Sequence, residues 1–309
     1  MGLIPLTHGG PDNGENFEYH WNGDYIHAHL LSDVGKKRAH NEDSCIFCAP
    51  QDMALLYDRG LLFAVADGMG GASAGELASR LALHILINEY YAEKTGVIPD
   101  RLTEALQAAN ARIFAEAEKN PEFRGMGTTV SAVVIHGSCA YIGQVGDSRV
   151  YLKRTERRIF QITDDHSLVA EQVRNGYISQ QEARNHSLKN LITRAVGIKG
   201  TVESDLFSLR LQEDDLILIC SDGLSNMLDD NEISSVLTSE SVQSAVRVLI
   251  GKALAKGGND NITAVLLRVA KEPPVRPLQE GADEVNVPAP GLFNRLKAIL
   301  RNPQAKNRD

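Results

Sequence analysis

The sequence predicts an α+β fold whose strands form antiparallel sheets. Short strand-like runs joined by tight turns fill residues 128–162, and strand character returns between residues 206 and 269. Two segments with helical spacing, 76–91 and 101–119, come before these strands. Strands that follow one another through tight turns pair antiparallel.

Each predicted element depends on its own pattern of apolar residues. Alternation of apolar with other residues indicates a strand, and the unbroken run 61–66 indicates a strand buried on both faces. A helix is predicted where apolar residues form a stripe, as Leu102, Ala105 and Ala109 do. The predicted strands are 27–34, 44–48, 61–66, 128–135, 139–145, 150–152, 159–162, 206–211, 216–220 and 262–269, and the predicted helices are 76–91, 101–119 and 241–255.

Composition divides the chain into an arm, a domain and a tail. Residues 1–27 are polar and rich in glycine, which predicts an irregular arm. Residues 28–270 are expected to form one domain, with a polar, helical subdomain inserted at about 164–200. Residues 271–309 are expected to be a flexible linker followed by a short helix at 291–301. That helix is basic and amphipathic, so it could pack on the domain, form a frayed end, or dock on an anionic membrane surface or in a partner's groove.

The bulk properties limit the class of protein. The chain has 309 residues, 43% of them hydrophobic and 23% charged, which is typical of a globular protein with a substantial core. A formal net charge of -8 argues against general nucleic-acid binding. No apolar run approaches the roughly 18 residues of a membrane span, and no signal-like segment starts the chain. We therefore expect a cytoplasmic protein.

The segment that follows the buried strand 61–66 carries a candidate site. The strand ends in Asp67-Gly68, and glycines permit backbone conformations that turn a carbonyl toward whatever the carboxylate holds. A carboxylate beside a carbonyl favours a hard cation. A simple turn remains an alternative at this point, whereas a P-loop does not, because Glu76 and Leu77 stand where Lys and Ser or Thr are needed.

The same arrangement recurs at the end of the strand 216–220, where Asp222-Gly223 follows. Five aspartates lie at strand ends or in loops that touch strands: Asp43, Asp67, Asp147, Asp222 and Asp260. Such carboxylates repel one another near neutral pH unless cations are bound, and all-oxygen ligation selects Mg²⁺ or Mn²⁺. Two such ions about 4 Å apart can lower the pKa of a water molecule between them, so that it attacks a phosphorus atom as hydroxide. The planar guanidinium of Arg38 can donate two parallel hydrogen bonds to phosphate oxygens.

Cys45 and Cys48 form a lone C-x-x-C pair, and we interpret them as residues that pack within a strand.

Taken together, the motifs resemble the metal-dependent serine/threonine phosphatases of the PP2C (PPM) type, closest to the stand-alone bacterial members. The resemblance covers about residues 28–270. It is carried, in family order, by GxxRxxNED at 35–43, VADGMGG at 65–71, GTT at 127–129, VGDSR at 145–149, SDGL at 221–224 and GNDNIT at 258–263, with a flap-like pair at 165–167 and 192–195. It implies an α-β-β-α sandwich of two antiparallel β-sheets flanked by helices.

The resemblance also implies how the metals are held. Asp67 would bridge two ions, with the Gly68 carbonyl completing the second, while Asp222 and Asp260 hold the first. Asp147 would join Asp222 at a third, more weakly bound ion. The ions would be Mn²⁺ or Mg²⁺, and a metal-bound hydroxide would attack the phosphorus of phosphoserine or phosphothreonine in line.

The remaining roles implied by the resemblance concern substrate and support. Arg38 would bind the substrate phosphate, and Glu42 and Asp43 would support the metals through water or as neighbours of the ligands. The implied partners are phosphoprotein substrates and a cognate Ser/Thr kinase, and we expect a monomer.

The residue that protonates the leaving group is open, because the positions where family members often carry a histidine hold Met69 and Ala72. His40 is the nearest alternative in sequence, and a metal-bound water is another. Two rival functions were weighed. One is a catalytically dead scaffold that binds phosphorylated partners through Arg38, and the other is a metal nuclease, which the negative charge disfavours.

Overall fold

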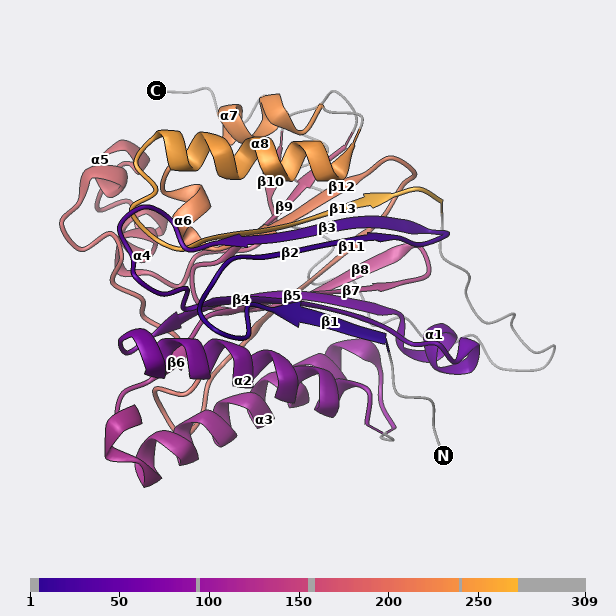
Figure 1. The fold of residues 1–309 in the computed structure, drawn as a ribbon, viewed down its shortest axis with the longest axis horizontal. Coiled ribbons are helices and arrows are strands. Elements are labelled where there is room, and N and C mark those ends of the chain that lie inside the picture. Colours follow the sequence, from indigo (N-terminus) through magenta and orange to yellow (C-terminus); the bar gives the residue numbers. More distant parts are fainter. Residues whose placement is uncertain (1–5, 93–94, 155–158, 239–240, 272–309) are drawn as a thin grey trace.

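The computed structural model describes residues 6–92, 95–154, 159–238 and 241–271. Two antiparallel sheets lie face to face, and helices cover the outer face of each sheet (Figure 1). The predicted α-β-β-α sandwich is thereby confirmed. The predicted C-terminal linker and the segment 291–301 lie outside the described residues.

One sheet has seven strands, in the order β1-β4-β5-β7-β8-β11, with β6 paired to β5 beside this path. The paired strands run antiparallel throughout. The bounds are β1 Leu6–Gly10, β4 Asp43–Ala49, β5 Leu61–Met69, β6 Gly127–Thr128, β7 Val130–His136, β8 Cys139–Val145 and β11 Asp205–Arg210.

The other sheet has six strands, in the order β10-β9-β12-β13-β3-β2, also antiparallel. Its strands are β2 Phe17–Asn22, β3 Ile26–Asp33, β9 Arg149–Lys153, β10 Phe160–Gln161, β12 Leu216–Cys220 and β13 Ile262–Val269. The helices of the described residues are α1 Met53–Arg59, α2 Ala72–Tyr90, α3 Ile98–Lys119, the 3-10 helix η1 Pro121–Phe123, α4 Leu168–Arg174, α5 Gln180–Asn185, α6 Asp222–Ser225, α7 Asp230–Val236 and α8 Val242–Ala255.

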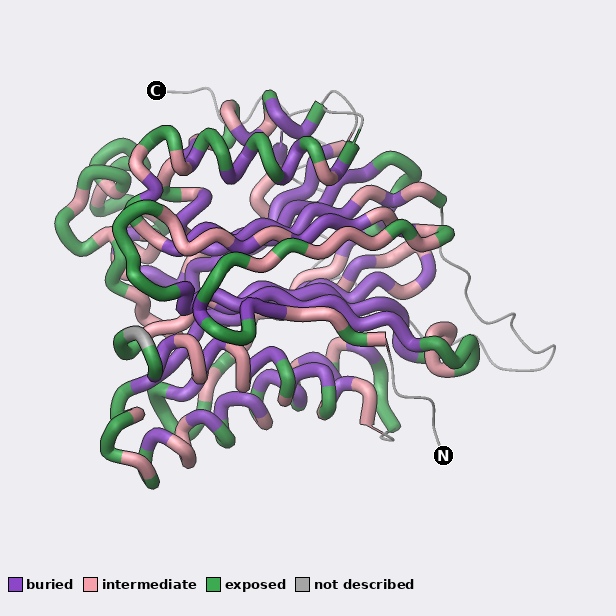
Figure 2. Tube along the Cα trace, in the orientation of Figure 1, coloured by how far each residue is buried: buried purple, intermediate pink, exposed green. Residues whose placement is uncertain are grey.

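Strand β5 explains why its sequence is an unbroken apolar run. Side chains alternate along a strand, so Phe63 and Val65 point into the core between the sheets, while Leu62 and Ala64 point toward the helices. All of these side chains are fully buried. The rings of Phe63 and Phe47, from neighbouring strands, stack with centroids 4.8 Å apart. Figure 2 shows the resulting buried layers within both sheets.

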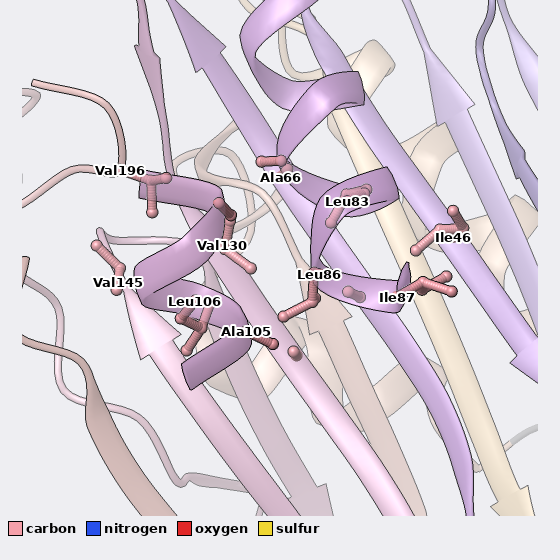
Figure 3. Close-up of a cluster of buried hydrophobic side chains, with 14 of the residues drawn as sticks. Ile46, Ala66, Leu83, Leu86, Ile87, Ala105, Leu106, Val130, Val145 and Val196 are labelled. Atoms are coloured by element: carbon pink, nitrogen blue, oxygen red, sulfur yellow. The ribbon is translucent and has the colours of Figure 1, made fainter. Parts of the chain in front are cut away.

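Helices α2 and α3 cover the seven-stranded sheet with their apolar stripes. Leu83 and Leu86 of α2 and Leu106 of α3 are completely or almost completely buried, and they meet Ala66 and Val130 of the sheet (Figure 3). Because an aliphatic side chain contributes about 1.5–3 kcal/mol when fully buried, this layer holds the end of β5 firmly in place.

The prediction that the N-terminal residues form an irregular arm is wrong for the part that the structure describes. Residues 6–10 form β1, which pairs with β4, and residues 17–22 form β2, which pairs with β3. Both are edge strands, so each keeps a polar, partly exposed side that hides the strand pattern in the sequence. The rings of His8 and Tyr19 stack across the two strands at 4.1 Å.

The other predicted strands and helices are present, with ends that differ by a few residues. Helices α1 and α7, which have 7 residues each, were not predicted from the sequence. Helix α7 had a readable signal, since Asp229 and Glu232 form a capping box. Cys45 and Cys48 are buried free thiols, and they pack into opposite cores, as expected for strand packing.

Candidate active site

The first pair of aspartates is brought together by strand pairing. Asp43 begins β4 and lies opposite Asp67 of β5 in the antiparallel register. Directly opposed residues of paired strands have neighbouring side chains, so the two carboxylates share one end of the sandwich. Asp43 is buried and Asp67 is half-buried, and loss of hydration is the main reason that the pKa values of both rise.

Asp222 joins this pair from the other sheet. It follows β12, begins α6, and its carboxyl group is within hydrogen-bonding reach of the Asp67 carboxyl group. Burial, followed by the charge of Asp260, raises the pKa of Asp222 to about 6. Burial raises the pKa of Asp43 to about 7 and that of Asp67 well above its usual value, with neighbouring carboxylates adding to both. The cluster therefore needs positive charge to ionise fully near neutral pH.

Asp147 supplies the clearest sign that the cluster fits a cation. Its side chain is 7% exposed, and its Oδ1 atom is buried without a hydrogen-bond partner. A buried carboxylate oxygen without a partner is costly unless a ligand satisfies it. Burial, together with the charge of Asp222, raises the pKa of Asp147.

In the described part of the chain, no three His, Cys, Asp or Glu side chains form a ready-made metal shell. Mg²⁺ does not require one, because it usually keeps several waters and is held by one or two carboxylates. Carboxylate oxygens with a nearby main-chain carbonyl are the ligands that Mg²⁺ and Mn²⁺ prefer. The donor set of the cluster thus fits these ions.

The backbone of Asp67 is fixed by the GTT motif. The Asp67 amide donates to Thr129 Oγ1 at 2.9 Å, and the Asp67 carbonyl accepts from the Thr128 hydroxyl and the Thr129 amide, each at 2.9 Å. A Cβ at Gly68 would lie 2.2 Å from the carbonyl oxygen of Gly75, so this position requires glycine. The GTT motif therefore fixes the Asp67 backbone, and close packing explains the glycine that follows Asp67.

Asp43 is held differently from the other aspartates. Its Oδ2 atom accepts hydrogen bonds from Ser221 Oγ at 2.7 Å and from Thr263 Oγ1 at 2.6 Å. Ser221 directly precedes Asp222, so Asp43 ties the ends of β4, β12 and β13 together.

Arg38 lies at the rim of the cluster. Its Nη2 atom donates to Asp260 Oδ2 at 2.9 Å, and its Nη1 atom donates to Glu42 Oε1 at 3.4 Å. The Arg38 side chain is 45% exposed, so the guanidinium reaches solvent beside the aspartates. The structure thus brings together Arg38, Glu42, Asp43, Asp67, Asp222 and Asp260 at one end of the sandwich, with Asp147 beside Asp222.

His166 lies in the flap-like segment 165–167, and no role was predicted for it from the sequence. Its fully buried Nδ1 atom accepts from the Gly146 amide at 3.0 Å, and its Nε2 atom lies 3.2 Å from Asp205 Oδ2. Burial lowers the pKa of His166, so the ring is neutral at pH 7. Because Gly146 precedes Asp147, this histidine fixes the turn that carries Asp147. The sequence Asp165-His166-Ser167, part of the flap-like pair, was the signal from which this role could have been predicted.

His40, the alternative proton donor, lies on the exposed loop before Glu42. Its carbonyl oxygen accepts from Asn261 Nδ2 at 2.9 Å, and its ring lies against Gly14. The ring therefore faces the N-terminal segment. Its role as a proton donor stays a prediction.

Two antiparallel sheets with aspartates from both sheets gathered at one end are the arrangement expected of a metal-dependent phosphatase. The family model described as "Protein phosphatase 2C" matches residues 35–260. The chain belongs to this family and is a protein phosphatase by class.

Similar sequences agree with this assignment. The "Serine/threonine phosphatase stp" of Listeria welshimeri is 39% identical over 249 residues, which cover 78% of this chain and 95% of that protein. The PstP phosphatase of Mycobacterium tuberculosis is 38% identical over 238 residues, which cover 77% of this chain and 44% of that protein.

Solved structures agree as well. A crystal structure of the Mycobacterium tuberculosis phosphatase PstP/Ppp superposes with a TM-score of 0.71 at 35% identity and covers 80% of this chain and 100% of that one. The PstP catalytic domain in complex with two manganese ions has a TM-score of 0.69 at 36% identity, with coverages of 80% and 99%.

Proposed function

We propose that this chain removes phosphate from phosphoserine and phosphothreonine in proteins, with two divalent ions in the aspartate cluster and a third held more weakly. The observation that carries the proposal is the direct approach of Asp67 and Asp222, two half-buried carboxyl groups at the ends of strands from different sheets. The phosphatase names of the relatives and the manganese ions in the PstP structure support it. Nothing among the relatives supports the scaffold alternative.

In this proposal Asp67 would hold two ions, and the Gly68 carbonyl would contribute to one of them. Asp222 and Asp260 would hold the other ion, and Asp147 would join Asp222 in holding the third. When bound, Mn²⁺ or Mg²⁺ lowers the pKa of a coordinated water and neutralises charge that develops on phosphate. The buried Oδ1 atom of Asp147, which lacks a hydrogen-bond partner, supports the third position.

Arg38 binds the substrate phosphate in this proposal. Its guanidinium offers a planar fork of donors, and carboxylates on Asp260 and Glu42 aim it at the rim of the cluster. Asp43 acts through Ser221 and Thr263 as a support of the metal ligands. Glu42 supports them from the Arg38 side.

Phosphate release from a phosphothreonine peptide tests the proposal. We expect release with added Mn²⁺ or Mg²⁺, and loss of release when a chelator is present. An inactive enzyme with every divalent ion tried would refute the proposal. Hydrolysis of DNA or RNA by the same preparation would instead favour the nuclease alternative.

A second part of the proposal concerns placement in the cell. No helix within the described ranges is long and apolar enough to cross a membrane. We propose a cytoplasmic monomer that opposes a Ser/Thr kinase, with residues 291–301 docking on an anionic membrane surface or a partner. Co-sedimentation with anionic vesicles, comparing the full chain with one that ends at Lys271, tests the membrane version. Equal sedimentation of the two would exclude it.

A further inference from the structure

Residues 11–16, which we call the N-terminal clamp, cross from one sheet to the other at the end that carries the aspartates. They follow β1, whose Gly10 lies opposite Cys45 near the start of β4. They precede β2, whose Phe17 lies opposite Ser32 near the end of β3. Both anchoring strands are edge strands of different sheets (Figure 1). The clamp is therefore fixed at both ends.

The clamp contacts the segment 34–42, which we call the arginine loop because it carries Arg38. The Val34 amide donates to Asn16 Oδ1 at 2.8 Å, and the Asn41 amide donates to the Gly14 carbonyl at 2.8 Å. Asn41 Nδ2 also donates to the Glu15 carbonyl at 3.1 Å. These bonds hold the arginine loop near both of its ends.

Between its ends, the arginine loop is held by the Lys36 amide, which donates to the Gly258 carbonyl at 2.8 Å, and by the pairing of Arg38 with Asp260 and Glu42. Residues 36–40 are exposed, whereas Asn41 and Glu42 are buried. From the opposite side, Asn261 holds the loop through the carbonyls of Val34 and His40, each at 2.9 Å. The arginine loop thus lies between residues 260–263 on one side and the N-terminal clamp on the other.

The clamp also reaches the helix that follows the Asp67 turn. Arg80 Nη1 of α2 donates to the Asp12 carbonyl at 2.7 Å. Gly14 is buried with φ +69°, and a Cβ there would lie 3.1 Å from Glu76 Oε2 and 3.5 Å from His40 Nδ1. Only a residue without a side chain fits this position comfortably.

We propose that the N-terminal clamp holds the arginine loop in the conformation that presents Arg38 to the substrate phosphate, and that Asn16 is a positioning residue for substrate binding. The family match begins at residue 35, so the clamp lies outside the shared family segment. The inference rests on the proposed role of Arg38. If the arginine loop also samples other conformations, the apparent substrate affinity falls in proportion to the fraction of time that the loop spends in the binding conformation.

The test compares Asn16→Ala with Asn22→Ala, an exposed asparagine at the far end of β2, the strand that follows the clamp. In Asn16→Ala we expect KM for a phosphothreonine peptide to rise by about threefold to tenfold, the range set by losing such hydrogen bonds, with kcat within about twofold. Amide exchange should be faster across residues 33–42, and Mn²⁺ binding should be unchanged. Asn22→Ala should match wild type in all four measurements.

Gly14→Ala is a second variant, with thermal unfolding as a check on folding. It should raise KM in the same direction, because it strains a left-handed residue beside His40. Unchanged exchange across 33–42 in both clamp variants would overturn the proposal, as would faster exchange with unchanged KM. Arg38→Ala separates the two ideas: an unaltered KM there would refute the role of Arg38, while amide exchange would still decide whether the clamp orders the loop.

Discussion

Asp43 and Asp67 face each other across an antiparallel strand pair. Of the two, Asp43 is the one whose Oδ2 atom accepts hydrogen bonds from two hydroxyl groups, those of Ser221 and Thr263. Asp67 instead has its main chain held by Thr128 and Thr129, which leaves its carboxyl group for the centre of the cluster. Two identical side chains on paired strands thus have different hydrogen-bond partners, which is why we propose different roles for them.

Asp67→Asn is expected to abolish the paired-metal site, because an amide is a poor bridging ligand. Activity should fall by about three orders of magnitude or more, as loss of a central catalytic element generally causes. Calorimetric titration should show weaker Mn²⁺ binding. Asp24→Asn, at an exposed turn between β2 and β3, is the control. Turnover near that of wild type with intact Mn²⁺ binding would contradict the bridging role.

Asp147→Ala is expected to spare the tightly bound pair of ions and to reduce kcat by about tenfold or more. It should also leave the metal-free protein at least as stable as wild type, because it removes a buried carboxylate oxygen that lacks a partner. Thermal unfolding in chelator and kcat across a Mn²⁺ series check both parts. An unchanged kcat would remove the third-metal role.

The metal-free protein is expected to lose stability as pH rises from about 4 to about 7. Burial holds the folded pKa of Asp222 at about 6 and that of Asp43 at about 7, above the usual value of 3.8. The folded state therefore binds more protons than the unfolded state in this window, so the free energy of unfolding falls as pH increases.

Mn²⁺ should reverse this effect, because it binds the ionised carboxylates. The rise in Tm on adding Mn²⁺ is expected to be larger at pH 8 than at pH 5, by on the order of 5 °C. Measuring the difference with and without Mn²⁺ at each pH cancels titrations elsewhere in the protein. An equal or smaller rise at pH 8 would argue against a metal site built from these aspartates.

His166→Ala is expected to lower kcat by about tenfold, because the Gly146 amide loses its acceptor and the Asp147 turn loosens. His166→Asn should recover part of the loss, since its side-chain oxygen can replace the Nδ1 acceptor. The Mn²⁺ concentration that gives half-maximal kcat should rise in the Ala variant. If both variants required the same Mn²⁺ concentration as wild type, His166 would not position Asp147.

Most of the fold was predictable because its strands and helices have regular patterns. The run 61–66 predicted a strand buried on both faces, and the structure places it between two cores. The strands in the N-terminal segment were missed because edge strands are half exposed and carry polar residues such as His8 and Glu18. Their partners, β4 and β3, are identified only by the assembled sheets.

The candidate site was predictable in its residues but not in its supports. Asp67 follows the apolar run 61–66 within β5, and Asp222 follows the apolar strand β12, a local signal that sequence can display. The contact of His166 with Gly146 and that of Asn16 with Val34 depend on how separate segments pack. No periodicity reports such pairs, because they arise from the tertiary arrangement.

Strand β5 belongs to the hydrophobic cores on both of its faces, and this has a consequence for how activity can fail. Local opening cannot release Asp67 without exposing both cores, so the amides of β5 should exchange only through global unfolding. The arginine loop is exposed and should exchange through small local openings. Heating or mild denaturant should therefore weaken substrate capture well before metal binding, so the two halves of the site should have separate thermal limits.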